Sequence, residues 1–129
     1  MLGIVIVAHG GLAREYLATL EHVMGTQTGV RAIGIDPDSD RDTKSAEICE
    51  AADAVDQGHG VVVVTDLHGG SPSNLARQAC IPAGRSILFG ANMPMLIKLA
   101  KSRHLPIGEA LRAAKEAGRK YIDSQSSGE

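Results

Sequence analysis

The chain has 129 residues, of which 43% are hydrophobic and 22% charged, which suits one packed domain and is too short for two. Thirteen basic and fifteen acidic residues give a net charge of −2 with no basic block, which argues against nucleic acid as a partner. No apolar run approaches the ~20 residues of a membrane span. Cys49 and Cys80 show no disulfide or metal spacing, and we expect each to be a small buried side chain in a helix. We therefore expect a reduced, cytoplasmic protein without membrane insertion.

Apolar strand patterns alternate with helical patterns along the chain. Leu2–Ala8 is continuously apolar and rich in β-branched residues, which is typical of a strand buried on both faces of a parallel sheet. The other predicted strands are Val30–Ile35, Val61–Thr65 and Ser86–Gly90, and the predicted helices are Leu12–Met24, Arg41–Gln57, one from Pro72, one from Pro94, and Pro106–Tyr121. This alternation predicts an α/β fold with a single doubly wound, mostly parallel four-stranded sheet and helices on both faces.

Several boundaries carry their own signals. The stretch 36–40, with three aspartates, predicts a solvated turn that caps the next helix, because it lacks the Gly and terminal Glu of a calcium loop. Ser71 fits a helix N-cap and Pro72 the first helical position. Lys120–Ser124 fits either the end of the last helix or a short edge strand. We expect a domain over residues 1–123 and a frayed polar tail over 124–129.

A candidate reaction centre lies at the carboxyl ends of the predicted strands, where doubly wound sheets bind ligands. His9 ends the first strand and Asp66 the third, and the loop 91–93 follows the fourth. A neutral imidazole attacks phosphorus through one nitrogen while the other keeps its proton, and a carboxylate that accepts this N–H fixes the tautomer. We therefore predict that His9 accepts a phosphoryl group and that Asp66 orients its ring.

The glycine turns beside these residues predict a phosphate site that needs no fixed cation and no metal ion. Backbone N–H groups of Gly10, Gly11, Gly70 and Ser71, with the Ser71 hydroxyl, can bind the phosphoryl oxygens. The chain has no G-x-G-x-x-G motif and no Walker lysine, so we expect no nucleotide or other cofactor. His68 is the rival nucleophile, but a carboxylate two residues away in a bending loop orients a ring poorly, so we place His68 at a partner-facing rim.

Three stretches together, Gly3–Gly10, Thr65–Asn74 and Gly90–Leu96, resemble the mannose-type enzyme IIA family of the bacterial phosphoenolpyruvate:sugar phosphotransferase system. The resemblance implies that His9 takes a phosphoryl group from the phosphocarrier HPr and passes it to a IIB domain. It further implies that Asp66 holds the ring and that the serine at position 71 lies beside the phosphate. A homodimer that exchanges a fifth, antiparallel C-terminal edge strand is also implied, consistent with the two readings of Lys120–Ser124.

The destination of the phosphate stays open at the level of sequence. Many family members continue into a IIB domain, whereas this chain stops, so we expect the acceptor to be a separate protein that serves sugar uptake or a regulatory relay. A phosphoryl-relay subunit for a dihydroxyacetone kinase and a non-catalytic regulatory interaction module are the alternatives. A response-regulator receiver fits poorly, because His9-Gly10-Gly11 stands where that fold needs acidic residues.

Overall fold

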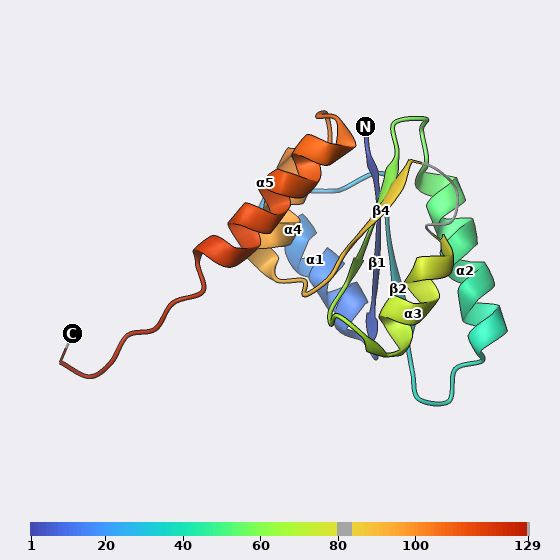
Figure 1. Cartoon of the computed structure of the whole chain (residues 1–129), viewed down its shortest axis with the longest axis horizontal. Helices are drawn as coiled ribbons and strands as arrows, with labels where there is room; N and C mark the ends of the chain where they lie inside the picture. Colours follow the sequence, from blue (N-terminus) through green and yellow to red (C-terminus); the bar gives the residue numbers. More distant parts are fainter. Residues whose placement is uncertain (80–83, 129) are drawn as a thin grey trace.

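The computed structural model of the chain describes residues 1–79 and 84–128, and its elements follow the predicted order (Figure 1). The strands are β1 (Gly3–His9), β2 (Val30–Ile35), β3 (Val61–Thr65) and β4 (Arg85–Leu88), and the helices are α1 (Leu12–Met24), α2 (Arg41–Val55), α3 (Gly70–Ala79), α4 (Met93–Lys101) and α5 (Ile107–Lys120). The predicted boundaries differ from these by at most two residues.

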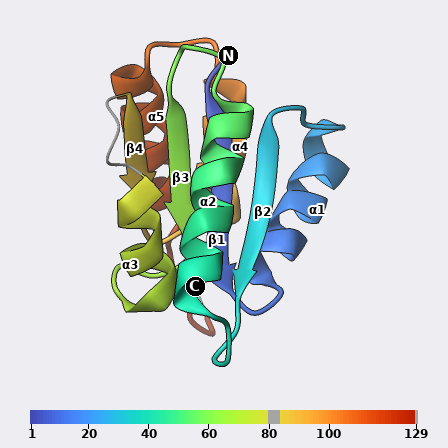
Figure 2. The same cartoon turned by 90° about the vertical axis from the view of Figure 1, so that its right-hand side faces the viewer.

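The described residues form one sheet of four parallel strands in the order β2-β1-β3-β4, with β1 and β3 in the centre (Figure 2). Helices α1, α4 and α5 cover one face of the sheet, and α2 and α3 cover the other (Figure 1). The predicted doubly wound α/β fold is confirmed. Each strand continues into a helix across the sheet, so all four strands point their carboxyl ends to the same edge.

Two apolar cores hold the layers together, one on each face of the sheet. Ile4 and Ile6 of β1 point into the core beneath α1 and α4, and Val5 and Val7 point into the core beneath α2 and α3. Side chains alternate along a strand, so a strand covered on both faces must be apolar at every position. This is why β1 and β3 show continuous apolar runs.

The start of α3 differs from the prediction. The helix begins at Gly70, so Ser71 lies inside the first turn and is not the N-cap, and Pro72 is the third helical residue. The Ser73 hydroxyl, one turn further on, accepts the N–H of Gly69 at 2.9 Å and donates to the carbonyl of Gly70 at 3.2 Å. Pro72 is still tolerated, because N–H groups in a first turn have no helical acceptor.

The remaining local predictions have different outcomes. Asp40 is confirmed as the cap of α2, since its carboxylate accepts the Thr43 N–H at 2.9 Å.

Helix α5 ends at Lys120, and residues 122–126 form neither helix nor strand, so the exchanged edge strand stays a prediction. Cys49 is half-buried against the core under α2, and Cys80 lies outside the described residues. No helix formed by the described residues has the length and hydropathy to cross a membrane.

Candidate active site

The carboxyl ends of β1 and β3 lie side by side at the centre of the sheet. The chain turns to opposite faces after these two strands, to α1 after β1 and to α3 after β3, so a crevice opens between them. The parallel register pairs Val7 with Thr65. Asp66, which directly follows β3, therefore lies close to His9, the last residue of β1.

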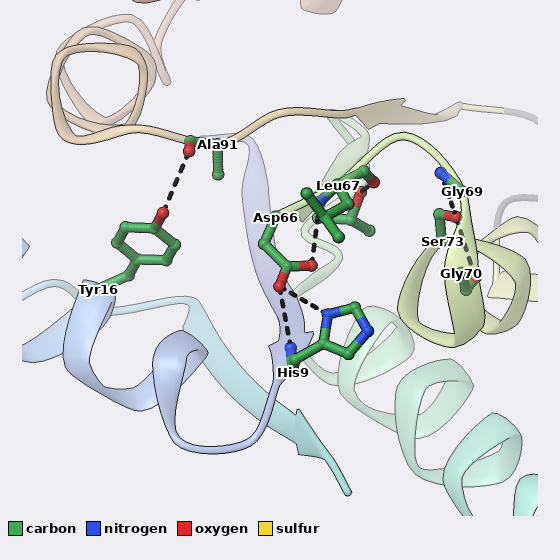
Figure 3. A network of polar contacts seen from close by, with 9 residues as sticks. His9, Tyr16, Asp66, Leu67, Gly69, Gly70, Ser73 and Ala91 are labelled. Atoms are coloured by element: carbon green, nitrogen blue, oxygen red, sulfur yellow. Dashed lines mark hydrogen bonds and ion pairs between the residues drawn. The ribbon is translucent and has the colours of Figure 1, made fainter. Parts of the chain in front are cut away.

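His9 and Asp66 are joined by two hydrogen bonds to the same oxygen (Figure 3). Asp66 Oδ2 lies 2.8 Å from His9 Nδ1 and accepts the His9 backbone N–H at 3.1 Å. The other oxygen, Oδ1, accepts the backbone N–H of Leu67 at 3.0 Å. The Asp66 side chain is 9% exposed and that of His9 is 49% exposed. A fixed, buried carboxylate thus holds a ring that faces solvent.

The charge of Asp66 decides the tautomer of His9. Burial alone would raise the pKa of Asp66, but the hydrogen bonds from the His9 ring and backbone and the positive charge of the ring together lower it below its usual value. An ionised carboxylate has no hydrogen to donate, so the proton of the 2.8 Å bond lies on Nδ1. When the ring is neutral, Nε2 then carries the lone pair, and no described residue forms a hydrogen bond with it.

Two glycines give this ring its space. Gly70 has φ +82°, a region that L side chains rarely adopt, and a Cβ there would stand 3.8 Å from His9 Nε2. Gly34 of β2 lies against the turn after β1, where an added Cβ would collide with the carbonyl oxygen of Gly10. The bare backbone at Gly34 lets the turn pass close to β2, and that at Gly70 leaves one side of the imidazole open.

The four predicted phosphate donors lie close to His9 but differ in availability. Gly10 already donates its N–H to the carbonyl of Ile35 at 2.9 Å. The carbonyl of Gly11, the N-cap of α1, accepts the Glu15 N–H at 3.1 Å, and this bond leaves the Gly11 N–H itself available as a donor. Gly70 and Ser71 begin α3, and the first N–H groups of a helix have no acceptor within it. Gly11, Gly70 and Ser71 are therefore better placed than Gly10 to donate to an anion, while the role of all four residues stays a prediction.

Beside His9 lies a cavity of about 580 Å³, and part of its wall was missed by sequence reasoning. Its lining residues are His9, Gly10, Ile35, Asp36, Pro37, Ser39, Arg41, Ser71 and Leu75. Five of these residues come from the end of β2, the start of α2 and the turn between them: Ile35, Asp36, Pro37, Ser39 and Arg41. The signal that could have found them is the parallel order of the strands, because β2 also ends at this edge.

The third predicted loop supports the site from behind. The Ala91 N–H donates to the carbonyl of Thr65 at 3.0 Å, and the Tyr16 hydroxyl donates to the carbonyl of Ala91 at 3.1 Å (Figure 3). Burial and the negative charge of Asp66 raise the pKa of Tyr16, so its hydroxyl stays protonated and able to donate. The loop after β4 thus braces the end of β3 but contributes no group to the cavity beside His9.

His68 lies in a different environment from His9. Its ring packs against Phe89, with ring centroids 4.4 Å apart and an interplanar angle of 68°. It lines a second cavity of about 390 Å³ near β4, together with Phe89 and Ile122. No carboxylate of the described residues forms an ion pair with it.

Comparison with known families assigns the chain to a family. The model of the EIIA-man family, described as the PTS system fructose IIA component, matches residues 3–115. The chain belongs to this family. The predicted resemblance to mannose-type enzyme IIA is confirmed, and the family is one of IIA components of the phosphotransferase system.

Two curated relatives from Escherichia coli K12 show how much of a longer protein this EIIA chain matches. It is 30% identical over 124 residues to the PTS system mannose-specific EIIAB component of Escherichia coli K12, covering 94% of this chain and 38% of that protein. The putative phosphotransferase enzyme IIA component YadI of the same strain is 29% identical over 104 residues, covering 80% of this chain and 71% of YadI. The chain therefore spans well under half of the EIIAB relative that it matches.

Solved structures of EIIA proteins share the fold. The PTS IIA protein associated with the fucose utilization operon of Streptococcus pneumoniae is 30% identical, with a TM-score of 0.77 and 88% coverage of both chains. The mannose/sorbose-specific IIA subunit from Enterococcus faecalis is 20% identical, with a TM-score of 0.87 and coverage of 99% of this chain and 97% of that one. The fold of the EIIA family thus persists where identity is low.

Proposed function

We propose that this EIIA chain is a phosphohistidine carrier that accepts a phosphoryl group on Nε2 of His9 from an HPr-type phosphocarrier and passes it to a IIB domain or protein. The single observation that carries the proposal is the 2.8 Å contact between His9 Nδ1 and Asp66 Oδ2, which in the neutral ring leaves the lone pair on Nε2. Membership of the EIIA-man family supports it. We place the protein in the cytoplasm, where two isolated cysteines stay reduced.

The transfer step needs no proton to move between the two proteins. The lone pair of Nε2 attacks phosphorus as the P–N bond of the donor phosphohistidine breaks, and that bonding pair returns to the donor ring. His9 becomes a phosphorylated imidazolium that keeps its proton on Nδ1, and the donor ring leaves neutral. The reaction then runs in reverse order toward the acceptor.

Asp66 and α3 have separate tasks in this step. The carboxylate of Asp66 holds the ring in one tautomer and stabilises the positive charge that develops on it. The N–H groups of Gly70 and Ser71, at the positive end of α3, are placed to bind the phosphoryl oxygens. In this proposal His9 exchanges the phosphoryl group only with other proteins. The acceptor protein, and not the His9 site, therefore determines whether the group reaches a sugar or a kinase.

A homodimer is part of the proposal, formed by exchange of the segment after α5. Tyr121 and Ile122 are 66% and 76% exposed, and the segment extends away from the body of the molecule (Figure 1). Exposed apolar side chains on an extended segment favour pairing with the open edge of β4 in a second copy. Light scattering should give twice the monomer mass, and Ile122→Asp should shift it toward the monomer. A wild-type monomer at micromolar concentration would contradict the dimer.

Mapping of the modified residue tests the carrier function. The protein is incubated with phosphoenolpyruvate, enzyme I and HPr, and the phosphorylated peptide is identified by mass spectrometry under alkaline conditions. We expect one phosphoryl group, on His9, that is lost in acid and stable in alkali. A phosphoryl group on His68, or an alkali-labile acyl phosphate on Asp66, would overturn the proposal.

A further inference from the structure

The cavity beside His9 holds one cation that no part of the proposed mechanism uses. We propose that Arg41 binds the phosphoryl group carried on His9 and stabilises its dianionic form. The inference rests on the proposed carrier function and assigns Arg41 as a phosphate-binding residue of the same site. Arg41 is the first residue of α2 and lines the same cavity of about 580 Å³ as His9 and Ser71.

The direction of the His9 side chain explains why the two residues share a cavity. Alternate side chains of a strand point to the same face, so His9 continues the row of Val5 and Val7. Those valines pack beneath α2 and α3. His9 therefore projects toward the layer in which both of these helices begin, α2 with Arg41 and α3 with Gly70.

Arg41 is available for a ligand. Its side chain is exposed, and no carboxylate of the described residues forms an ion pair with it. The neighbouring carboxylate of Asp40 is occupied by the N–H of Thr43 at 2.9 Å and by its hydroxyl at 2.6 Å. The cap of α2 thus fixes the residue before Arg41 without neutralising the guanidinium.

The charges around the cavity favour a cation beside a bound phosphoryl group. Asp36 lines the cavity, and Asp66 lies under the His9 ring, so two carboxylates repel a phosphoryl dianion at Nε2. The developing imidazolium compensates for one of them, and Arg41 compensates for the other. A guanidinium also offers two parallel N–H donors that match two phosphoryl oxygens, which a lysine cannot do.

The test compares three variants of the phosphorylated protein: Arg41→Ala, Arg41→Lys and Arg31→Ala. Arg31 is the matched control, because its loss changes the net charge equally and it lines a different cavity with Glu47 and Glu50. The ³¹P resonance of the phosphohistidine is titrated with pH, and its midpoint reports protonation of the phosphoryl group or of the ring that carries it. A nearby cation disfavours protonation of either one and lowers this midpoint.

We expect Arg41→Ala to raise the ³¹P midpoint by about 0.5 to 1 pH unit, Arg41→Lys to raise it less, and Arg31→Ala to leave it unchanged. An unchanged midpoint in Arg41→Ala overturns the assignment of Arg41 while the carrier function stands. The same holds if Arg41→Ala slows transfer from HPr without moving the midpoint, because Arg41 then contacts the partner protein and not the phosphate. A wild-type protein that takes no phosphoryl group on His9 overturns the carrier function itself.

Discussion

His9 and His68 follow neighbouring strands at the same edge of the sheet, yet their rings have different neighbours. Asp66 Oδ2 lies 2.8 Å from Nδ1 of His9, whereas the ring of His68 packs on Phe89 at 4.4 Å between centroids. A carboxylate fixes which nitrogen carries the proton, and an aromatic neighbour does not. An exposed imidazole at a strand end becomes a nucleophile through a fixed acceptor for its second nitrogen, and position alone is not enough.

The sheet, and not the loop, supplies that acceptor. Asp66 is two residues from His68 along the chain, but its Oδ1 accepts the N–H of Leu67 and its Oδ2 faces His9 on the neighbouring strand. The pairing of Val7 with Thr65 sets this reach. A parallel pair of strands therefore gives one histidine an orienting carboxylate, and this is why we propose His9 and not His68 as the nucleophile.

The largest expected effect separates the two histidines directly. His9→Gln should abolish phosphorylation by phosphoenolpyruvate, enzyme I and HPr, because no nitrogen nucleophile remains at the cavity. His68→Gln should be phosphorylated at the wild-type rate, since its ring has no orienting carboxylate. Both rates are measured by radiolabel transfer. Labelled His9→Gln, or unlabelled His68→Gln of normal fold, would reverse the comparison.

A smaller effect is expected when the acceptor is removed and the ring is kept. The amide of Asp66→Asn can donate to Nδ1, which favours the tautomer with the proton on Nε2 and blocks attack. We expect phosphoryl transfer to slow by about 10- to 100-fold with an intact fold. Glu116→Gln, an exposed carboxylate of α5, is the matched control and should transfer normally. A normal rate for Asp66→Asn would mean that another group orients the ring.

Much of this arrangement could be predicted from the sequence, because it depends on local patterns. The apolar runs and helical periodicities indicate the order of elements, and the rule for parallel sheets brings the residues that end β1 and β3 to one edge. His9 and Asp66 follow from that rule and from the chemistry of imidazole. The contact between the ring and the carboxylate is the predicted one, the bond to the His9 backbone N–H was not foreseen, and the catalytic roles of both residues stay predictions.

Other parts of the site depend on register and strand order, which local patterns do not encode. The sequence does not reveal that the Gly10 N–H donates to the carbonyl of Ile35, because this bond forms only when β2 lies beside β1. The same pairing brings Arg41 into the cavity of His9. The sequence predicts Ser71 as the N-cap, but α3 begins at Gly70, and the hydroxyl that accepts the Gly69 N–H belongs to Ser73. A local pattern cannot distinguish two serines that lie two residues apart.

The pH dependence of stability gives a further, smaller measure of the His9–Asp66 contact. The pKa of Asp66 lies below its usual value in the folded protein, so folding favours the ionised carboxylate. Its contribution is therefore present above about pH 4 and is lost as the pH falls through the lowered folded-state pKa. The free energy of unfolding of wild type should exceed that of Asp66→Asn near neutral pH, and the difference should shrink in acid. A difference that grows in acid, in urea titrations, would contradict this sign.

The smallest effect is expected on the His68 side of the comparison. Phe89→Leu removes the edge contact with the His68 ring and the contact with the Arg77 guanidinium, which lies 5.5 Å from the Phe89 centroid. Such aromatic and cation–π contacts contribute about 0.5 to 1.5 kcal/mol each, and leucine retains part of the buried apolar area. We expect a small loss of thermal stability and an unchanged rate of His9 phosphorylation. Slower phosphorylation of a folded Phe89→Leu protein would mean that the rim formed by His68 and Phe89 contacts the phosphate donor, and the two histidines would then act in one step.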